Sequence, residues 1–254
     1  MNSRVILVSD DRSSLRSPDT LLWPDAACMR GIHTGEWTAH IFEYAMSFEG
    51  NMTQVRELAA ANGVGGQRPP GARATDPPGL IVCDVDSTVT RTEAIDLLAE
   101  CAGNADEVRE ITARAMVGEL DFTQSLYARV RCLEGLHIGA LEEAWKATVI
   151  TPGTAELVAA AHDVGAAVGL VSGGFTAIVD PLAEQIRADF AASNELEIVD
   201  NHLTGRVVGD IIDRAAKATW LRRWASERGV ALERTIALGD GANDLDMLAM
   251  SGQA

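Results

Sequence analysis

The chain has 254 residues, of which 47% are hydrophobic and 23% are charged. These proportions are those of a globular protein with a buried core, and they exclude collagen-like, fibrous and disordered chains. The formal net charge of −16 repels phosphate backbones and anionic lipids, so neither nucleic acid nor a membrane is an expected partner. The apolar run at 5–8 is too short for a signal peptide or a membrane span, which predicts a soluble, cytoplasmic protein.

An N-terminal appendage spans residues 1–61, and its pattern does not reveal a function. A strand is predicted at 4–9 and a helix at 51–61, which Asn62 and the following glycine would end. Residues 62–79 are predicted to be a linker, because glycine and proline occupy half of these positions and regular structure tolerates them poorly.

Three apolar runs in the remainder of the chain are typical of buried strands, at 80–85, 166–171 and 235–238. Helical patterns lie between them, which predicts an α/β fold with a parallel sheet covered by helices on both faces. Each run ends in acidic, hydroxyl or glycine residues. In such a sheet the ligand crevice lies beyond the carboxyl ends of the strands, where these polar residues would meet. The core is assigned to residues 80–92 and 151–254.

Residues 93–150 carry helical patterns alone, which predicts a small helical cap inserted after the first core strand. The four predicted helices are 93–102, 105–117, 121–133 and a weaker one at 141–148. Asp121 and Gln124 have the spacing of a capping box, which would fix the start of the third helix.

Asp84 and Asp86 stand two residues apart at the end of the first predicted strand, so their carboxylates point to the same side. Carboxylates this close repel each other, and either a shared proton or a hard cation such as Mg²⁺ would relieve the repulsion. Turn-forming and helix-capping roles remain the alternative for this pair. Asp240 and Asp244 follow the strand at 235–238, and Asp244 fits a helix N-cap equally well.

Ser172 and two glycines follow the strand at 166–171, a pattern that suits hydrogen bonds to a phosphate but is also that of a plain turn. Lys217 precedes a helical pattern, where a lone lysine is usually an exposed residue. Arg129 shares one helix face with apolar residues, so it either reaches out to solvent or meets an anion in the crevice. Glu93 either complements a helix dipole or meets a substrate ammonium group.

The four clusters, taken in order, resemble the motifs of the haloacid dehalogenase (HAD) superfamily of phosphotransferases. The motifs are DVDST, SGG, Lys217 and GDGAND. Longer stretches, among them DVDSTVTRTEAIDLLAECAG, VSGGF and GDGANDLDML, resemble the phosphoserine phosphatases within that superfamily. The resemblance covers about residues 80–250 and implies an HAD-like Rossmannoid core with a helical cap.

The resemblance implies a phosphoserine phosphatase that hydrolyses O-phospho-L-serine through an aspartyl-phosphate, as a step of serine biosynthesis. Asp84 would be the nucleophile and Asp86 the acid and base. Asp84, the backbone carbonyl of Asp86 and Asp240 would bind Mg²⁺, with Asn243 and Asp244 supporting them.

The remaining roles implied by the resemblance concern the phosphoryl group and the substrate. Ser172, the Gly173 amide and Lys217 would bind the phosphoryl oxygens. In the cap, Glu93 would meet the ammonium group and Arg129 the carboxylate. The apolar wall of the substrate site would come from Met116 and Phe122.

The sequence departs from the family pattern at both ends. Family members continue past GDGANDLDML into another strand, whereas this sequence stops at Ala254, so an exposed sheet edge and lower stability are expected. Relatives often carry a regulatory domain of the ACT type before the core. Residues 1–61 fit a remnant of such a domain, or a dimerisation arm that would make a homodimer.

Other functions stay open at this point. A phospho-acceptor module of the receiver type uses strand-end acids in a different order and has no helical cap. A catalytically impaired phosphoserine-binding regulatory protein is suggested by the short C-terminal part. A phosphotransferase of the same superfamily would use the same residues as the phosphatase.

Overall fold

The computed structural model describes residues 3–9, 27–34, 37–44, 65–67 and 77–254. The chain divides into two compact units, 1–76 and 77–254, each of which is described by itself. None of the helices in the described residues is long and apolar enough to cross a membrane.

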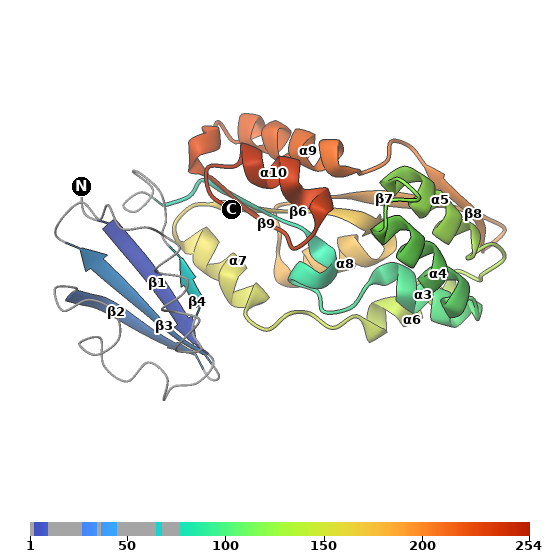
Figure 1. Cartoon of the computed structure of the whole chain (residues 1–254), viewed down its shortest axis with the longest axis horizontal. Coiled ribbons are helices and arrows are strands. Elements are labelled where there is room, and N and C mark those ends of the chain that lie inside the picture. Colours follow the sequence, from blue (N-terminus) through green and yellow to red (C-terminus); the bar gives the residue numbers. More distant parts are fainter. Residues whose placement is uncertain (1–2, 10–26, 35–36, 45–64, 68–76) are drawn as a thin grey trace. The chain divides into compact units, whose positions relative to one another are not determined.

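The first unit contains an antiparallel sheet in the order β2-β3-β1-β4 (Figure 1). Its strands are β1 (Ser3–Ser9), β2 (Ala27–Thr34), β3 (Trp37–Tyr44) and β4 (Gly65–Gln67). The strand predicted at 4–9 is therefore confirmed, whereas the helix predicted at 51–61 lies outside the described residues.

β4 corrects the prediction that residues 62–79 contain no regular structure. Three of these residues pair with β1 in antiparallel register, with Gln67 opposite Ile6. A short strand at the edge of a sheet tolerates glycine, and the first proline of the segment, Pro69, comes only after it. The unit boundary falls between Asp76 and Pro77.

The second unit contains a five-stranded sheet in the order β8-β7-β6-β5-β9. Its strands are β5 (Leu80–Cys83), β6 (Ala167–Phe175), β7 (Phe190–Val199), β8 (His202–Val208) and β9 (Thr235–Leu238). The three pairs that these strands form among β7, β6, β5 and β9 are parallel, as predicted. The expectation of a wholly parallel sheet is wrong at β8, which pairs antiparallel with β7.

The hairpin between β7 and β8 explains this difference. Its two turn residues, Asp200 and Asn201, have φ angles of 49° and 61°. Positive φ at both positions is the backbone of the tight two-residue turn that joins antiparallel strands, and Asp and Asn adopt it more readily than most residues.

Helices cover both faces of this sheet, as the sequence predicts (Figure 1). On one face α7 (Thr154–Asp163) and α8 (Thr176–Ile186) pack against Ile81 and Cys83 of β5. On the other face α9 (Arg214–Glu227) and α10 (Leu245–Met250) pack against Leu80 and Val82. The alternation along β5 buries all four of its side chains, because successive strand residues point to opposite faces.

Between β5 and α7 the chain forms the cap. Its helices are α3 (Ala94–Ala102), α4 (Ala105–Met116), α5 (Phe122–Arg131) and α6 (Gly139–Ala147). Asp121 and Gln124 form the predicted capping box at the start of α5. The segments entering and leaving the cap pair with each other at Thr90 and Ile150, so a short two-chain connection joins the cap to the core.

β9 lies at an edge of the sheet, and part of this edge is covered. Gln253 bridges to Ile236 in parallel register, and it exchanges backbone hydrogen bonds of 3.1 and 2.8 Å with Thr235 and Ala237. The expectation of a wholly exposed edge is therefore corrected at these residues.

Candidate active site

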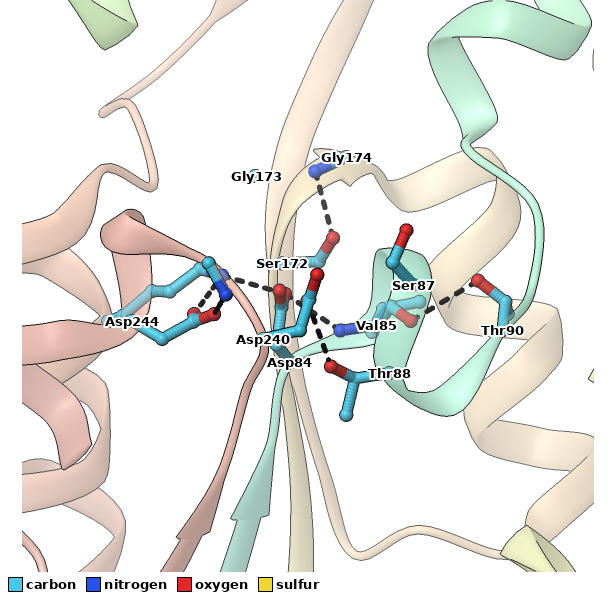
Figure 2. A network of polar contacts seen from close by, with 12 residues as sticks. Asp84, Val85, Ser87, Thr88, Thr90, Ser172, Gly173, Gly174, Asp240 and Asp244 are labelled. Carbon is cyan, nitrogen blue, oxygen red and sulfur yellow. Dashed lines mark hydrogen bonds and ion pairs between the residues drawn. The ribbon is translucent and has the colours of Figure 1, made fainter. Parts of the chain in front are cut away.

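Asp84 begins a tight loop that follows β5 directly. Its Oδ1 accepts a hydrogen bond of 2.7 Å from the Val85 amide, and the loop η2 (Val85–Val89) closes where the Thr90 amide and hydroxyl both donate to the Val85 carbonyl (Figure 2). Ser87 adopts φ 59°, an unusual value for a residue with a side chain. The loop thereby turns the chain back and leaves Asp84 and Asp86 at the carboxyl end of the sheet.

Lys217 forms ion pairs with both Asp84 and Asp244. Its Nζ lies 2.7 Å from Asp84 Oδ1 and 2.6 Å from Asp244 Oδ1, and its side chain is fully buried. The position follows from α9, whose N-cap Asp213 accepts from the Ala216 amide and starts the helix one turn before Lys217. The alternative of an exposed lysine is therefore wrong.

Asp244 is also fully buried, and its side chain makes no cap on α10. Its Oδ2 accepts a 3.0 Å hydrogen bond from the Gly241 amide, and its Oδ1 accepts from Lys217. The helix N-cap considered from the sequence is therefore wrong for this side chain.

The environment shifts both acids of the first motif toward the protonated form. Burial raises the pKa of Asp84 to about 6, against the opposing effect of Lys217. Burial, with smaller contributions from Glu93 and Asp84, raises the pKa of Asp86 to about 7. The Ala94 amide at the start of α3 donates to Asp86 Oδ1 at 3.2 Å. A carboxyl group with a pKa near neutrality can both give and take a proton.

Three acids form a group that could hold a cation. Asp84, Asp240 and Asp244 each offer an oxygen, and these oxygens lie within 4.8 Å of one another. Carboxylate oxygens are the ligands that hard divalent cations prefer, so the group fits Mg²⁺. The side chain of Asp86 is not in this group.

Ser172, Gly173 and Gly174 lie in the last part of β6, which extends beyond the predicted end at 171. Figure 2 shows the Gly174 amide donating to the Ser172 hydroxyl, over 2.8 Å. A Cβ atom at Gly174 would lie 2.8 Å from Asp86 Oδ2, closer than real contacts allow. A side chain at this position would therefore displace the Asp86 carboxylate, because the backbone passes close to the acid.

A cavity of about 690 Å³ opens between the core and the cap. Most residues predicted for the site line it: Asp84, Asp86, Glu93, Met116, Phe122, Arg129, Gly173, Asp240 and Asn243. Ser172 and Lys217 are not among the lining residues, and both are fully buried. The structure thus brings the residues of the core and the cap to one cavity.

Arg129 is the basic residue that the cap contributes to the cavity, and it is half-buried. Burial lowers the pKa of its guanidinium, while Glu93, Asp96 and Asp86 raise it. Arg131, two residues on, is exposed. Arg129 therefore lines a cavity that is otherwise rich in acidic side chains.

The two apolar residues of the cap differ in burial. Phe122 is half-buried and lies against Gly173 of β6, since a Cβ atom at Gly173 would be 2.7 Å from its Cζ. Met116 is 83% exposed at the end of α4. Only Phe122 forms a closed wall in this structure, while Met116 lines the mouth.

Sequence reasoning did not identify Thr88 and Arg214 as site residues. Thr88 donates a hydrogen bond of 3.1 Å to Asp240 Oδ1 (Figure 2). It thereby orients one of the three acids that could hold a cation. Arg214 lines the cavity and pairs with Asp246. The position of Thr88 four residues after Asp84, in the same motif, is a signal that could have indicated its role.

Comparisons with known proteins agree with this architecture. The family model of the haloacid dehalogenase-like hydrolases matches residues 81–249. The chain is 54% identical over 173 residues to a phosphoserine phosphatase of Streptomyces coelicolor, covering 68% of this chain and 42% of that protein. This chain thus spans less than half the length of that relative.

Two solved structures extend the comparison. The unliganded structure of a probable phosphoserine phosphatase from Vibrio cholerae has a TM-score of 0.80 and 35% identity, covering 98% of this chain and 76% of that one. A substrate-bound phosphoserine phosphatase complex has a TM-score of 0.66 and 40% identity, covering 70% and 84%. With the match over the core and the cap, the chain belongs to the haloacid dehalogenase-like hydrolases.

Proposed function

We propose that this chain is a Mg²⁺-dependent phosphoserine phosphatase, which releases L-serine and phosphate in serine biosynthesis. One observation carries the proposal: a single cavity has the acids Asp84 and Asp240 on the core side and Arg129 and Glu93 on the cap side. O-phospho-L-serine has the complementary groups, a phosphoryl group at one end and an amino acid at the other. The similarity to phosphoserine phosphatases supports this substrate.

Mg²⁺ would be held by carboxylate oxygens of Asp84, Asp240 and Asp244 and by the Asp86 carbonyl. When bound, it supplies positive charge that draws electron density from the phosphoryl oxygens. Thr88 orients Asp240 by its hydrogen bond, and the buried Lys217 keeps Asp84 and Asp244 together.

Asp84 is the nucleophile in this proposal. Lys217 and the Val85 amide both bind Oδ1, so the attack on phosphorus is assigned to Oδ2. A bond forms between this oxygen and phosphorus while the bond from phosphorus to the serine oxygen breaks. Lys217 favours the ionised form of Asp84, which counteracts the effect of burial on its pKa.

Asp86 transfers the protons. Its pKa of about 7 keeps part of it protonated at neutral pH, so it can give a proton to the departing serine oxygen. The resulting carboxylate then takes a proton from the water that attacks phosphorus and releases phosphate from Asp84. Cap closure over the cavity would limit the access of other water during these steps.

Donors from β6 and α9 would bind the phosphoryl oxygens. Ser172, the Gly173 amide and Lys217 supply them, and Asn243 adds an amide at the cavity wall. Such donors lower the barrier because they are already oriented before the charge redistributes. In the cap, Arg129 binds the substrate carboxylate and Glu93 the ammonium group, with Phe122 and Met116 beside them.

Phosphate release from O-phospho-L-serine and from a panel of phosphate esters, with Mg²⁺ or with EDTA, tests the proposal. We expect selective, metal-dependent release from phosphoserine. No release from any ester by the folded protein would favour a phosphoserine-binding regulatory protein. Adding homoserine as an acceptor separates the phosphatase from a phosphotransferase, since a transferase would make phosphohomoserine in place of free phosphate.

A further inference from the structure

Asn194, in β7, is a fully buried amide that lies outside the residues assigned to the reaction so far. Its Nδ2 donates to the Gly173 carbonyl at 2.8 Å, and its Oδ1 accepts from the Ile212 amide at 2.8 Å. One partner is an acceptor and the other a donor, so the orientation of the side-chain amide is fixed by its surroundings. Both the nitrogen and the oxygen of the side-chain amide therefore have hydrogen-bond partners in the protein interior.

The first of these bonds fixes the peptide between Gly173 and Gly174. In a planar trans peptide the carbonyl and the N–H point in opposite directions. Because the Gly173 carbonyl is held by Asn194, the Gly174 N–H is directed away from it and donates to Ser172 Oγ at 2.8 Å (Figure 2). Asn194 thus acts on the Ser172 hydroxyl through one peptide unit.

This bond determines how Ser172 can bind an anion. A hydroxyl has one donor hydrogen, and its oxygen already accepts from the Gly174 amide. The hydrogen of Ser172 is then the group left to donate to a phosphoryl oxygen. The Ser172 oxygen and Asp86 Oδ2 lie together beneath Gly174, within 3.0 and 2.8 Å of the place of a Cβ atom there. The hydroxyl is therefore beside the acid that lines the cavity.

The second bond of Asn194 reaches the helix that carries Lys217. Ile212 immediately precedes Asp213, the N-cap of α9, and the Lys217 amide donates to the Asp213 carbonyl at 2.9 Å. A single side chain in β7 therefore connects the end of β6, at Gly173, with the start of α9.

We propose that Asn194 is a positioning residue, which orients the Ser172 hydroxyl as a donor and fixes the end of β6 relative to the start of α9, the helix that carries Lys217. The inference rests on the proposed phosphatase function, in which both groups bind the phosphoryl oxygens. It predicts that loss of the amide weakens the binding of a phosphoryl mimic, beyond any loss of stability.

The test compares Asn194→Leu, which removes both hydrogen bonds at similar volume, with Thr235→Val as a matched control. Thr235 is also fully buried, donates to the Leu232 carbonyl at 2.7 Å and stands at the opposite end of β9 from Asp240. The measurements are kcat and KM for phosphoserine, the inhibition constant of orthovanadate, and the melting temperature, with activity assayed well below melting.

For Asn194→Leu we expect about tenfold or greater weakening of orthovanadate inhibition and a similar loss in kcat. This is less than the roughly 10²–10³-fold loss for direct removal of one oriented donor, because Asn194 acts through Ser172. Thr235→Val should lower the melting temperature and leave orthovanadate inhibition unchanged. An active Asn194→Leu variant with a wild-type inhibition constant would overturn the inference. Wild-type protein that releases no phosphate would instead overturn the proposed function.

If Asn194→Leu does not fold, ¹⁵N-resolved NMR of the wild-type protein tests the inference instead. The side-chain amide signals of Asn194 are expected to shift on addition of orthovanadate, together with the backbone amide signal of Gly174. A shifted Gly174 signal with unchanged Asn194 signals would overturn the inference.

Discussion

The Lys217 ammonium lies 2.7 Å from the Asp84 carboxylate, in a position closed to solvent. The same ammonium binds Asp244, so one cation holds two acids from different strand ends. Isolated buried charges are costly, and removal of one partner leaves the others uncompensated. This arrangement makes Lys217 a structural as well as a chemical part of the site.

Lys217→Met should therefore lower the free energy of unfolding by about 3–5 kcal/mol at neutral pH and abolish phosphate release. Urea unfolding of the metal-free protein measures the first effect. Lys146→Met is the matched control, because Lys146 forms an exposed ion pair with Glu142 and its loss should cost under about 1 kcal/mol. Equal stability of the two variants would contradict the buried ion pair.

Arg129→Ala should weaken the binding of phosphoserine far more than that of phosphoethanolamine, which has the ammonium group but no carboxylate. Loss of a hydrogen bond between charged groups costs about 1.5–3 kcal/mol, so KM for phosphoserine should rise roughly 10-fold to 100-fold. Steady-state kinetics on both esters measure it. Arg131→Ala, on the exposed neighbour, should change neither value. A uniform loss on both esters would make Arg129 structural.

Glu93→Gln tests the other end of the substrate with a second pair of esters. Its carboxylate is expected to bind the ammonium group, so the variant should have a lower affinity for phosphoserine. Its affinity for 3-phosphoglycerate, which has a hydroxyl in place of the ammonium group, should not change. Glu93 also accepts a 3.2 Å bond from Ser87, which glutamine can keep through its carbonyl oxygen. An equal rise in KM for both esters would exclude a role in ammonium recognition.

The stability of the metal-free protein should fall as pH rises from about 4 to about 7. In the fold the pKa values of Asp84 and Asp86 are raised to about 6 and about 7. An unfolded aspartate has a pKa of about 3.9, so the folded state binds more protons in this window. Urea unfolding across the window, in EDTA, measures the fall. Asp86→Asn should flatten its upper part, and an unchanged slope would contradict the assignment.

The strand-end motifs could be predicted from the sequence because three apolar runs break into polar residues at their carboxyl ends. Parallel pairing then brings Asp84, Ser172 and Asp240 to one edge, as the structure has them. Spacing placed Arg129 on the apolar face of its helix but left open whether it reaches solvent or the cavity, which it lines in the structure. The burial of Lys217 could not be predicted from its local pattern, because it depends on how α9 packs against the sheet, and only the resemblance to the family indicated a role for this residue.

β7 was missed for a related reason. Its buried positions are Ala192, Asn194 and Leu196, so a polar residue interrupts the apolar alternation by which a strand is identified. Asn194 is buried because its two hydrogen bonds satisfy it, which no local pattern reveals. The turn at Asp200 and Asn201 did carry a hairpin signal in its residue types.

Asp84 is the residue on which the proposed reaction depends most directly. Quenching turnover of phosphoserine with borohydride reduces an aspartyl-phosphate to homoserine, which peptide mass spectrometry locates. We predict homoserine at position 84 only when substrate is present, and neither homoserine nor phosphate release in Asp84→Asn. Wild-type turnover in Asp84→Asn, or homoserine at another position, would contradict the role of Asp84 as nucleophile.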